Sequence, residues 1–598
     1  MLIYAMPARF LPMTPDEVRK LGWDRLDIIL VTGDAYVDHP SYGAAVMGRV
    51  LEAHGFKVGI IAQPEFKNAQ AFKRLGKPRL FFGITAGNMD SMVANYTAHK
   101  RQRKTDDYSP GGKPGLRPDH AAIVYANRVR EAFKDVPIVL GGIEASLRRF
   151  AHYDWWKDEV KRSILLDSRA DILVYGMGET QIVDIAHRAA AGNPFSGIPG
   201  TALIAKSLDN EQNIIEIPSY EEVKADPDKF NEAFISILEN QDPFRGAVIA
   251  QKHASRYVIQ YPPALPVYGK ELDAIYELPY ARAWHPSYDK DGGVPGFETV
   301  RFSITSHRGC PGSCAFCGLS LHQGRIVGSR SEASIIREAA ALRKRNDFRG
   351  TINDIGGPTA NLYGASCKKW EQSGACPKKH CLTPFPCKQL DPGFQKSLSL
   401  FGKLGALPGI KHVFIASGFR HDLLIDERSR EYLEVVCKQH VSGRMKVAPE
   451  HSLPHVLKLM NKPDFSTYEK FSKLYRSMSK KLGKQQFLVN YFISAHPGCN
   501  LEDALSLTLK LKELGIHPEQ IQDFIPLPMT LSGAMYYTEK DPFTGAKLYV
   551  AKTFRERKMH RALIQYKNPK NTPLVREALA MLKKEYLMPQ LMPGRTRG

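Results

Sequence analysis

Three cysteines stand close together in the second half of the chain, Cys310, Cys314 and Cys317, with the spacing C-x3-C-x2-C. Thiolates are the preferred ligands of iron–sulfur clusters. A [4Fe–4S] cluster bound by three cysteines keeps one iron open, and an open metal position can bind a substrate. The spacing therefore indicates a cluster that takes part in chemistry. A zinc knuckle completed by His307 or His322 is the alternative, although zinc cysteines more often come in C-x2-C pairs.

Four more cysteines form a second group within 21 residues: Cys367, Cys376, Cys381 and Cys387. Four thiolates can hold tetrahedral zinc or a further iron–sulfur cluster. Their spacing fits neither standard pattern, so both possibilities stay open. Nine cysteines in 598 residues are too few for a disulfide scaffold, which favours a reducing, cytoplasmic location. No apolar run approaches the roughly 20 residues of a membrane span, and the first 27 residues do not resemble a signal peptide.

The first cysteine group directly follows a predicted strand, and that strand opens a series of alternating strands and helices. The strands of this series are predicted at 300–305, 351–355, 412–416, 444–447, 487–493 and 521–525. Such units build a complete or partial parallel (β/α) barrel, whose active site gathers at the carboxyl ends of its strands. We assign this barrel to residues 299–550, with a cysteine-rich insertion at 360–392.

The rest of the chain divides into three further parts. Residues 1–195 alternate short apolar strands with helices, which predicts an α/β fold with a doubly wound parallel sheet. Residues 196–298 are rich in Pro and Tyr and are predicted to form a connector. Residues 551–598 carry twelve Lys or Arg against three Glu and are predicted to form a basic tail. The net charge of +21 is explained either by a solvated basic surface or by a polyanionic partner such as RNA.

At this point the residues resemble a known family. The pattern C-x3-C-x-aromatic-C, with Phe316 as the aromatic residue, is similar to the cluster motif of the radical S-adenosylmethionine (SAM) superfamily. Gly356 and Gly357, after the second strand, resemble the glycine pair whose backbone receives the amino group of SAM, although the family's Glu is replaced by Pro358. Glu450, after the fourth strand, falls where the family places a residue that binds the ribose of SAM.

The resemblance extends beyond the barrel. The segments GDAYVDHPSYG, SHRGCPGSCAFCGLSLHQGR, VAPEH and FIPLPMT are similar to those of YgiQ-type radical SAM proteins over nearly the whole chain. The resemblance implies that the open iron chelates SAM. It also implies that an electron from a flavodoxin- or ferredoxin-like donor cleaves SAM to methionine and a 5′-deoxyadenosyl radical. That radical then takes a hydrogen atom from a substrate, for which RNA or another phosphorylated molecule is a candidate.

The N-terminal part resembles the cobalamin-binding type of domain that precedes many radical SAM cores. The family's D-x-H-x-x-G motif, which supplies a histidine to the cobalt, is absent, because Asp38 and His39 stand out of register. We therefore do not expect bound cobalamin.

Two functions from other classes remain as alternatives. The first is a non-catalytic iron–sulfur protein that senses redox state or binds nucleic acid. The second is a zinc-dependent RNA-binding module, which the barrel pattern disfavours. The number of cysteines in the first group favours the enzyme, because a sensor does not need an open iron.

Overall fold

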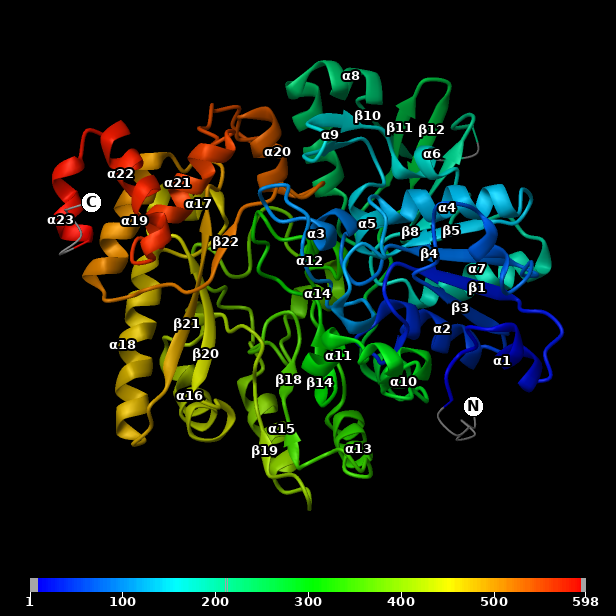
Figure 1. The fold of residues 1–598 in the computed structure, drawn as a ribbon, viewed down its shortest axis with the longest axis horizontal. Coiled ribbons are helices and arrows are strands. Elements are labelled where there is room, and N and C mark those ends of the chain that lie inside the picture. Colours follow the sequence, from blue (N-terminus) through cyan, green and yellow to red (C-terminus); the bar gives the residue numbers. More distant parts are fainter. Residues whose placement is uncertain (1–8, 210, 212, 593–598) are drawn as a thin grey trace.

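The computed structural model describes residues 9–209, 211 and 213–592 (Figure 1). Its N-terminal half is built on a nine-stranded sheet with the order β10-β11-β12-β9-β8-β5-β4-β1-β3. Five of its strands lie within the range 1–195, where the sequence predicts alternating strands and helices, and they run parallel: β1 (Ile28–Thr32), β3 (Val58–Ala62), β4 (Phe81–Thr85), β5 (Ile138–Gly141) and β8 (Ile172–Val174). The predicted α/β fold with a large parallel sheet is therefore confirmed.

Both faces of the parallel part of this sheet are covered, which explains why β1, β3, β4, β5 and β8 are largely apolar. Ile28 and Leu30 of β1 pack in one cluster with α2 (Gly43–Ala53) and α7 (Glu179–Ala191). Ile29 and Val31 point the other way, into the cluster that includes α4 (Ala121–Ala132). This alternation along one strand is the geometry of a pleated sheet between two helical layers.

Residues 196–298 differ from the predicted connector, because much of this range extends the sheet. Its strands are β9 (Thr201–Ala205), β10 (Ile214–Ile217), β11 (Val248–His253) and β12 (Arg256–Gln260). β9 runs antiparallel to β8, and β12 runs antiparallel to both β9 and β11. The turn between β11 and β12 consists of Ala254 and Ser255, with Ala254 in the left-handed region at φ 53°. It lacks the Asn-Gly or Asp-Gly signal that marks a hairpin in a sequence.

The second half of the chain forms the predicted series of parallel strands. They are β14 (Ser303–Thr305), β17 (Thr351–Ile352), β18 (Asp354–Gly356), β19 (His412–Val413), β20 (Arg444–Glu450), β21 (Phe487–Ser494) and β22 (Ile521–Asp523). β14 pairs with β18, β17 with β19, and β20 with β21, which pairs with β22. Among the described residues no ladder joins β22 back to β14, so the barrel is partial. Helices α13 (Glu332–Leu342), α15 (Phe394–Gly405) and α18 (Phe465–Lys481) lie between the strands.

The predicted basic tail is instead a packed helical unit, as far as the structure describes it. Helices α21 (Phe554–Ile564), α22 (Thr572–Met581) and α23 (Met588–Leu591) share an apolar cluster with α19 (Leu501–Glu513). The buried side chains of α21 recur at helical spacing. Of its Lys and Arg residues, Arg555 is exposed, Lys558 and Arg561 are partly exposed, and Arg557 is buried. Among the described residues no helix is long and apolar enough to cross a membrane.

Candidate functional site

The three cysteines of the first group lie on one loop between β15 (His307–Arg308) and α12 (Leu319–His322). Gly312 shows how closely they gather, because a methyl group placed on it would lie 3.3 Å from Cys310 Sγ and 3.7 Å from Cys314 Sγ. Burial raises the pKa of Cys317 to about 12, and the charges on Cys314 and Cys310 add to this rise. The structure therefore brings all three thiols together at the carboxyl end of the first barrel strand.

The loop is fixed by residues that are distant in the sequence. The backbone N–H of Ala315 donates to the carbonyl of Met460 (3.0 Å), and Asn461 Nδ2 donates to the carbonyl of Ser313 (3.1 Å). The N–H of Ser532 in α20 (Leu531–Thr538) donates to the carbonyl of Ala315 (2.9 Å). These bonds hold the thiols in place before any ligand binds, which is what a functional site requires.

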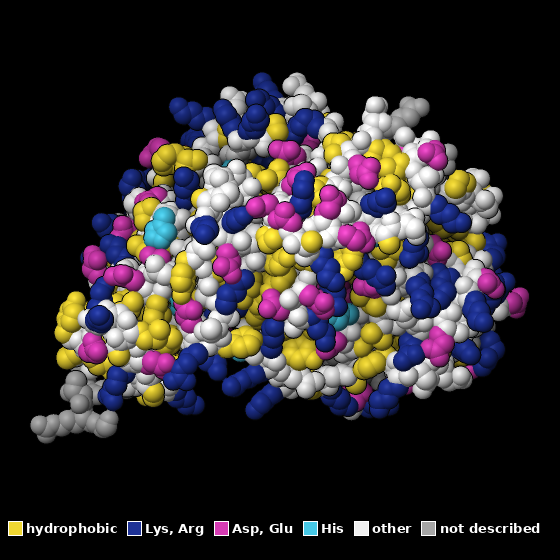
Figure 2. Space-filling view, turned by 90° about the horizontal axis from the view of Figure 1, so that it is seen from above, with side chains coloured by type: hydrophobic (Ala, Val, Ile, Leu, Met, Phe, Trp, Pro, Cys, Tyr) yellow, Lys and Arg dark blue, Asp and Glu magenta, His cyan; other side chains and the backbone are white. Residues whose placement is uncertain are grey.

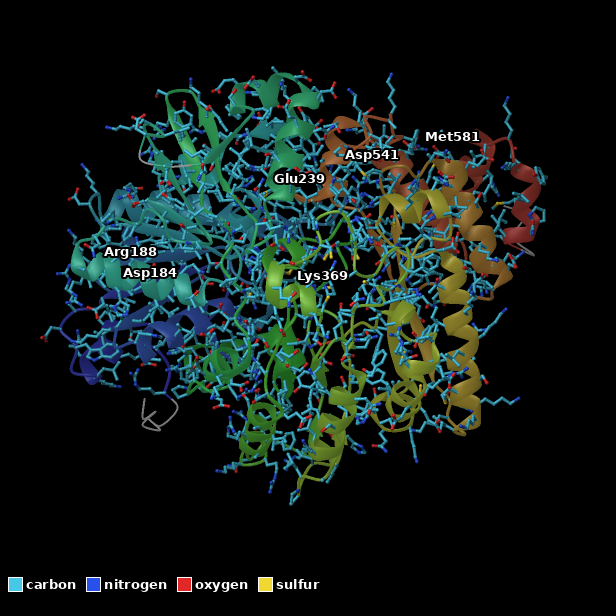
Figure 3. All side chains as sticks on the ribbon, turned by 180° about the vertical axis from the view of Figure 1, so that it is seen from behind. Asp184, Arg188, Glu239, Lys369, Asp541 and Met581 are labelled. Carbon is cyan, nitrogen blue, oxygen red and sulfur yellow. The ribbon has the colours of Figure 1, made fainter. Side chains whose placement is uncertain are left out.

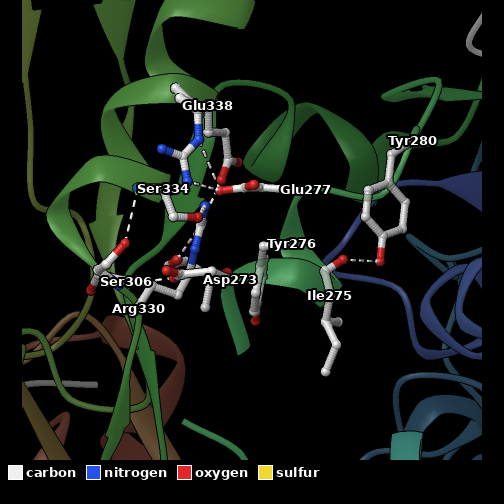
Figure 4. A network of polar contacts seen from close by, with 12 residues as sticks. Asp273, Ile275, Tyr276, Glu277, Tyr280, Ser306, Arg330, Ser334 and Glu338 are labelled. Atoms are coloured by element: carbon white, nitrogen blue, oxygen red, sulfur yellow. Dashed lines mark hydrogen bonds and ion pairs between the residues drawn. The ribbon is translucent and has the colours of Figure 1, made fainter. Parts of the chain in front are cut away.

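A buried polar network holds the strand that leads into this loop (Figure 4). Arg330 Nη1 donates to the carbonyl of Thr305, the last residue of β14, at 3.0 Å. The same guanidinium pairs with Glu338 of α13 and donates to Ser334 Oγ at 2.8 Å. The guanidinium thereby ties the carboxyl end of β14 to α13.

Arg420 is a charged neighbour of the thiols that the sequence does not point to. Its Nη1 lies 3.6 Å from Cys314 Sγ, and its Nε and Nη2 donate to the carboxylate of Asp422 at 2.8 and 2.7 Å. Both side chains are buried. A fixed positive charge beside the sulfurs stabilises thiolates and tunes the potential of a cluster that they bind.

The glycine pair lies beside the start of the cysteine loop. Gly356 ends β18 and accepts a hydrogen bond from the N–H of Ser306 (2.7 Å). Gly357 packs against His307, and a methyl group on it would lie 2.6 Å from the His307 carbonyl oxygen. The Thr359 hydroxyl then lies 3.4 Å from Cys310 Sγ. The structure thus brings the predicted glycines next to the predicted cluster ligands.

Gly357→Ala is expected to lower the free energy of unfolding by about 1–3 kcal/mol, because the added methyl group has no room beside His307. Gly402 in α15 is the matched control, since no atom lies within 4 Å of a methyl group there. Gly402→Ala is expected to raise the stability by up to about 1 kcal/mol. Urea unfolding of both variants checks this, and equal effects at the two positions would contradict it.

Phe316 belongs to the cysteine loop itself, whereas Glu450 comes from the end of β20. Glu450 ends β20 in the left-handed region (φ 68°), is buried, and has Lys462 Nζ at 3.8 Å. Burial raises the pKa of Glu450, while Lys462 and Arg420 oppose that rise. Phe316 contacts the ring of His496 with a centroid distance of 6.2 Å. Glu450 therefore shares the neighbourhood of Arg420 and the thiols, whereas Phe316 packs against the loop after β21.

The two histidines of the zinc-knuckle alternative are engaged elsewhere. His307 is buried, with Nε2 3.0 Å from the carbonyl of Thr359 and Nδ1 2.9 Å from Ser306 Oγ. His322 Nδ1 lies 3.2 Å from Ser146 Oγ of the N-terminal half. Among the described residues no three His, Cys, Asp or Glu side chains are arranged to hold a single metal ion. A zinc ion needs all of its ligand atoms around one point, whereas each cysteine of an iron–sulfur cluster binds a different iron. This arrangement therefore disfavours zinc but is compatible with a cluster.

A cavity of about 550 Å³ lies between the two halves of the chain. Its walls are the carboxyl ends of strands from both sheets, among them Thr32, Thr85, Gly141, Thr305 and Gly356. Glu179 on this wall pairs with Arg308 (2.5 Å), while its second oxygen, Oε2, is buried without a partner. The buried Tyr42 hydroxyl on the same wall also has no partner. Both are polar atoms that a ligand can satisfy.

The second cysteine group lies on a loop beside a separate cavity of about 590 Å³. Cys314 and Cys317 also line this cavity, whereas the second loop contributes Ala375, Pro377, Lys378 and His380 rather than its cysteines. Cys381 is buried and the other three cysteines of the group are partly exposed.

Comparisons with known proteins agree with this architecture. A family model described as "Radical SAM N-terminal" matches residues 10–303, and a domain of unknown function (DUF3362) matches residues 519–590. A UPF0313 protein of Methanocella arvoryzae is 51% identical over 579 residues, which cover 96% of each chain. A UPF0313 protein of Clostridium botulinum is 49% identical and covers 97% of this chain and 91% of its own length.

Among solved structures, the chain is similar to a radical SAM methyltransferase, TsrM from Kitasatospora setae, with cobalamin and a [4Fe–4S] cluster bound. The TM-score is 0.47 at 15% identity, over 85% of this chain and 73% of that one. This finding overturns the expectation that cobalamin is not bound. That expectation rested on a missing cobalt-binding histidine. In this chain His39 Nδ1 accepts a hydrogen bond from the N–H of Ser41, and its Nε2 lies 3.3 Å from Arg282 Nη1.

The resemblance to radical SAM proteins that the sequence predicts is thus confirmed by the family model and by relatives that match nearly end to end. The chain belongs to the UPF0313 family, within the radical SAM superfamily.

Proposed function

We propose that this protein binds a [4Fe–4S] cluster on Cys310, Cys314 and Cys317 and reductively cleaves SAM. The observation that carries the proposal is the gathering of these three thiols on one fixed loop at the carboxyl ends of the barrel strands. A cluster held there supplies an open iron for SAM and the electron that breaks the sulfonium bond. The donor set fits, because all three ligands are thiols and Arg420 offsets their charge.

The chain's own residues have separate roles in placing SAM. The backbone at Gly356 and Gly357 leaves room for the amino group of SAM, since neither residue carries a side chain. Glu450 accepts hydrogen bonds from the ribose hydroxyls, and Lys462 at 3.8 Å helps to keep its carboxylate charged. Burial of this pair excludes water from the ribose end of the site.

Glu450→Gln is expected to raise the SAM concentration for half-maximal cleavage by about 10-fold or more, because a hydrogen bond to a charged group contributes roughly 1.5–3 kcal/mol. Iron content is expected to stay unchanged, because Glu450 is not a cluster ligand in this proposal. Glu434→Gln is the control, since Glu434 pairs with Lys481 on the exterior of the barrel. Loss of iron in Glu450→Gln would show a structural role instead.

The substrate is proposed to lie in the cavity between the two halves. Its walls include the carboxylates of Asp34, Glu179 and Asp354, and burial raises the pKa of Asp34 to about 6. Asp34 and Glu179 are already paired with Arg117 and Arg308, so these walls favour a largely uncharged molecule with donor groups for Glu179 Oε2 and Tyr42 Oη. They disfavour a nucleic-acid strand. On the face that Figure 2 shows, Lys and Arg side chains are also interspersed with Asp and Glu rather than gathered in one stripe.

The experiment that tests the proposed function is anaerobic reconstitution with iron and sulfide, followed by reduction in the presence of SAM. A flavodoxin- or ferredoxin-like donor, proposed as the partner, is compared with dithionite. The expected product is 5′-deoxyadenosine together with methionine. A cluster that forms and is reduced while SAM stays intact would contradict the proposal and favour the redox-sensor alternative. Adding hydroxocobalamin and recording its bound absorbance tests the cavity between the two halves for that cofactor.

A further inference from the structure

The second cysteine group lies on a closed loop. Ser366 and Asp391 form an isolated antiparallel bridge, with N–O distances of 2.9 Å and 3.0 Å between their backbones. All four cysteines of the group lie between these two residues: Cys367, Cys376, Cys381 and Cys387. The bridge brings the two ends of the loop together, so that cysteines 20 positions apart in the sequence belong to one compact segment.

Cys381 lies near the other three cysteines of the group. The N–H of Cys387 donates to the carbonyl of Cys381 at 2.8 Å. Cys381 is buried and lies close enough to Cys376, Cys387 and Cys367 for the charges on all three to act on it. The loop buries few apolar side chains of its own, among them Trp370 and Leu382. A segment with so little core needs another source of order, and a bound metal group supplies one.

Contacts from outside hold the loop in place. Arg325 donates from Nη1 to the carbonyl of Cys376 (3.2 Å) and from Nη2 to that of Lys379 (3.1 Å). The N–H of Ala375 donates to Asp242 Oδ2 of the N-terminal half (2.8 Å). In Figure 3 the labelled Lys369 marks this loop, which lies between the two halves of the chain. The guanidinium of Arg325 also places a positive charge near Cys381, as four thiolates require.

We infer that Cys367, Cys376, Cys381 and Cys387 bind a second iron–sulfur cluster. Four thiolates form a complete ligand set for an iron–sulfur cluster, with one cysteine for each ligand position, so this cluster keeps no open iron for SAM. Ala375, Pro377, Lys378 and His380 of the loop line the same cavity of about 590 Å³ as Cys314 and Cys317, so the loop and the first group border one cavity.

The experiment uses the full chain with the first group removed, Cys310→Ala/Cys314→Ala/Cys317→Ala. After anaerobic reconstitution and desalting, this variant is expected to retain iron and acid-labile sulfide in equal amounts and to show the visible absorbance of a cluster. Adding Cys376→Ala and Cys381→Ala is expected to remove both iron and sulfide. The wild-type chain is expected to bind more iron than either partial variant.

Because the readout comes from a chain without the first group, it does not depend on SAM cleavage. Failure of the proposed function therefore leaves this test intact. The double variant Cys367→Ala/Cys387→Ala, made in the wild-type background, is a second test. It is expected to lower the iron content while the iron bound by the first group stays in place. Absence of iron from the triple variant, or one zinc per chain without sulfide, would overturn the inference.

Discussion

Cys314→Ala is expected to reduce formation of 5′-deoxyadenosine to the background of protein that lacks iron. In the proposed function the cluster needs three thiols, and Cys314 is the one that lies 3.6 Å from the guanidinium of Arg420. The measurement is the yield of 5′-deoxyadenosine after anaerobic reduction with SAM, together with the iron bound by the chain.

Cys437→Ala is the matched control, because Cys437 is buried in the core and belongs to neither cysteine group. It removes one thiol and some packing, and iron binding and SAM cleavage are expected to persist. If Cys314→Ala still formed 5′-deoxyadenosine at the wild-type yield, the assignment of the first cysteine group would fail, and with it the proposed function.

The parallel strands of both halves were predictable because a strand that is buried on two faces appears in the sequence as a short, nearly continuous apolar run. β1 reads IILVT, and every one of its residues is buried. β21 reads FLVNYFIS and was predicted from 487–493, within one residue of its observed end. In such strands local β propensity and burial in the core both favour apolar residues, so the sequence alone is enough to predict the strand.

The antiparallel extension of the sheet could not be predicted in the same way. β10 has two adjacent exposed residues, Ile215 and Glu216, and it pairs in parallel with β11, about thirty residues further along the chain and beyond two helices. In the C-terminal unit, the prediction of a basic tail rested on net charge, whereas the helical spacing of Met559, Ala562 and Leu563 indicates a packed helix. Charge on a surface and apolar spacing beneath it are independent features of one helix, and only the second predicts packing.

The candidate site shows the same division. The cysteines are visible in the sequence because their chemistry depends on local spacing. Arg420, Asp422 and Thr359 are not, because they meet the cysteine loop only through the fold, and Arg420 is 106 residues from Cys314. One sequence signal for Arg420 is its position shortly after the third predicted barrel strand, because residues at the carboxyl ends of barrel strands commonly form the active site.

Arg420→Met is expected to lower the free energy of unfolding by about 3–5 kcal/mol, because it leaves the carboxylate of Asp422 buried without its partner. The Asp422 side chain is 0% exposed and that of Arg420 is 8% exposed. Although burial alone raises the pKa of Asp422, the guanidinium reverses this and holds the pKa below its usual value. Urea unfolding measures the loss.

The exposed pair of Arg428 and Asp426 is the matched control, with the same two-residue separation and two contacts from one guanidinium at 3.1 and 2.7 Å. These side chains are 62% and 45% exposed, so Arg428→Met is expected to cost no more than about 1 kcal/mol. Arg420→Met combined with Asp422→Asn is expected to recover part of the loss, because no uncompensated charge remains. Comparable losses in Arg420→Met and Arg428→Met would contradict the buried pair.

A second readout separates the effect of Arg420 on the site from its effect on stability. In a reconstituted chain, Arg420→Met is expected to lower the reduction potential of the first cluster, because a nearby positive charge favours the more negative, reduced state. Arg420→Lys keeps the charge but loses the planar contact with Asp422, so it is expected to retain most of the potential while losing stability. A potential that did not move in Arg420→Met would mean that the guanidinium 3.6 Å from Cys314 Sγ serves Asp422 alone.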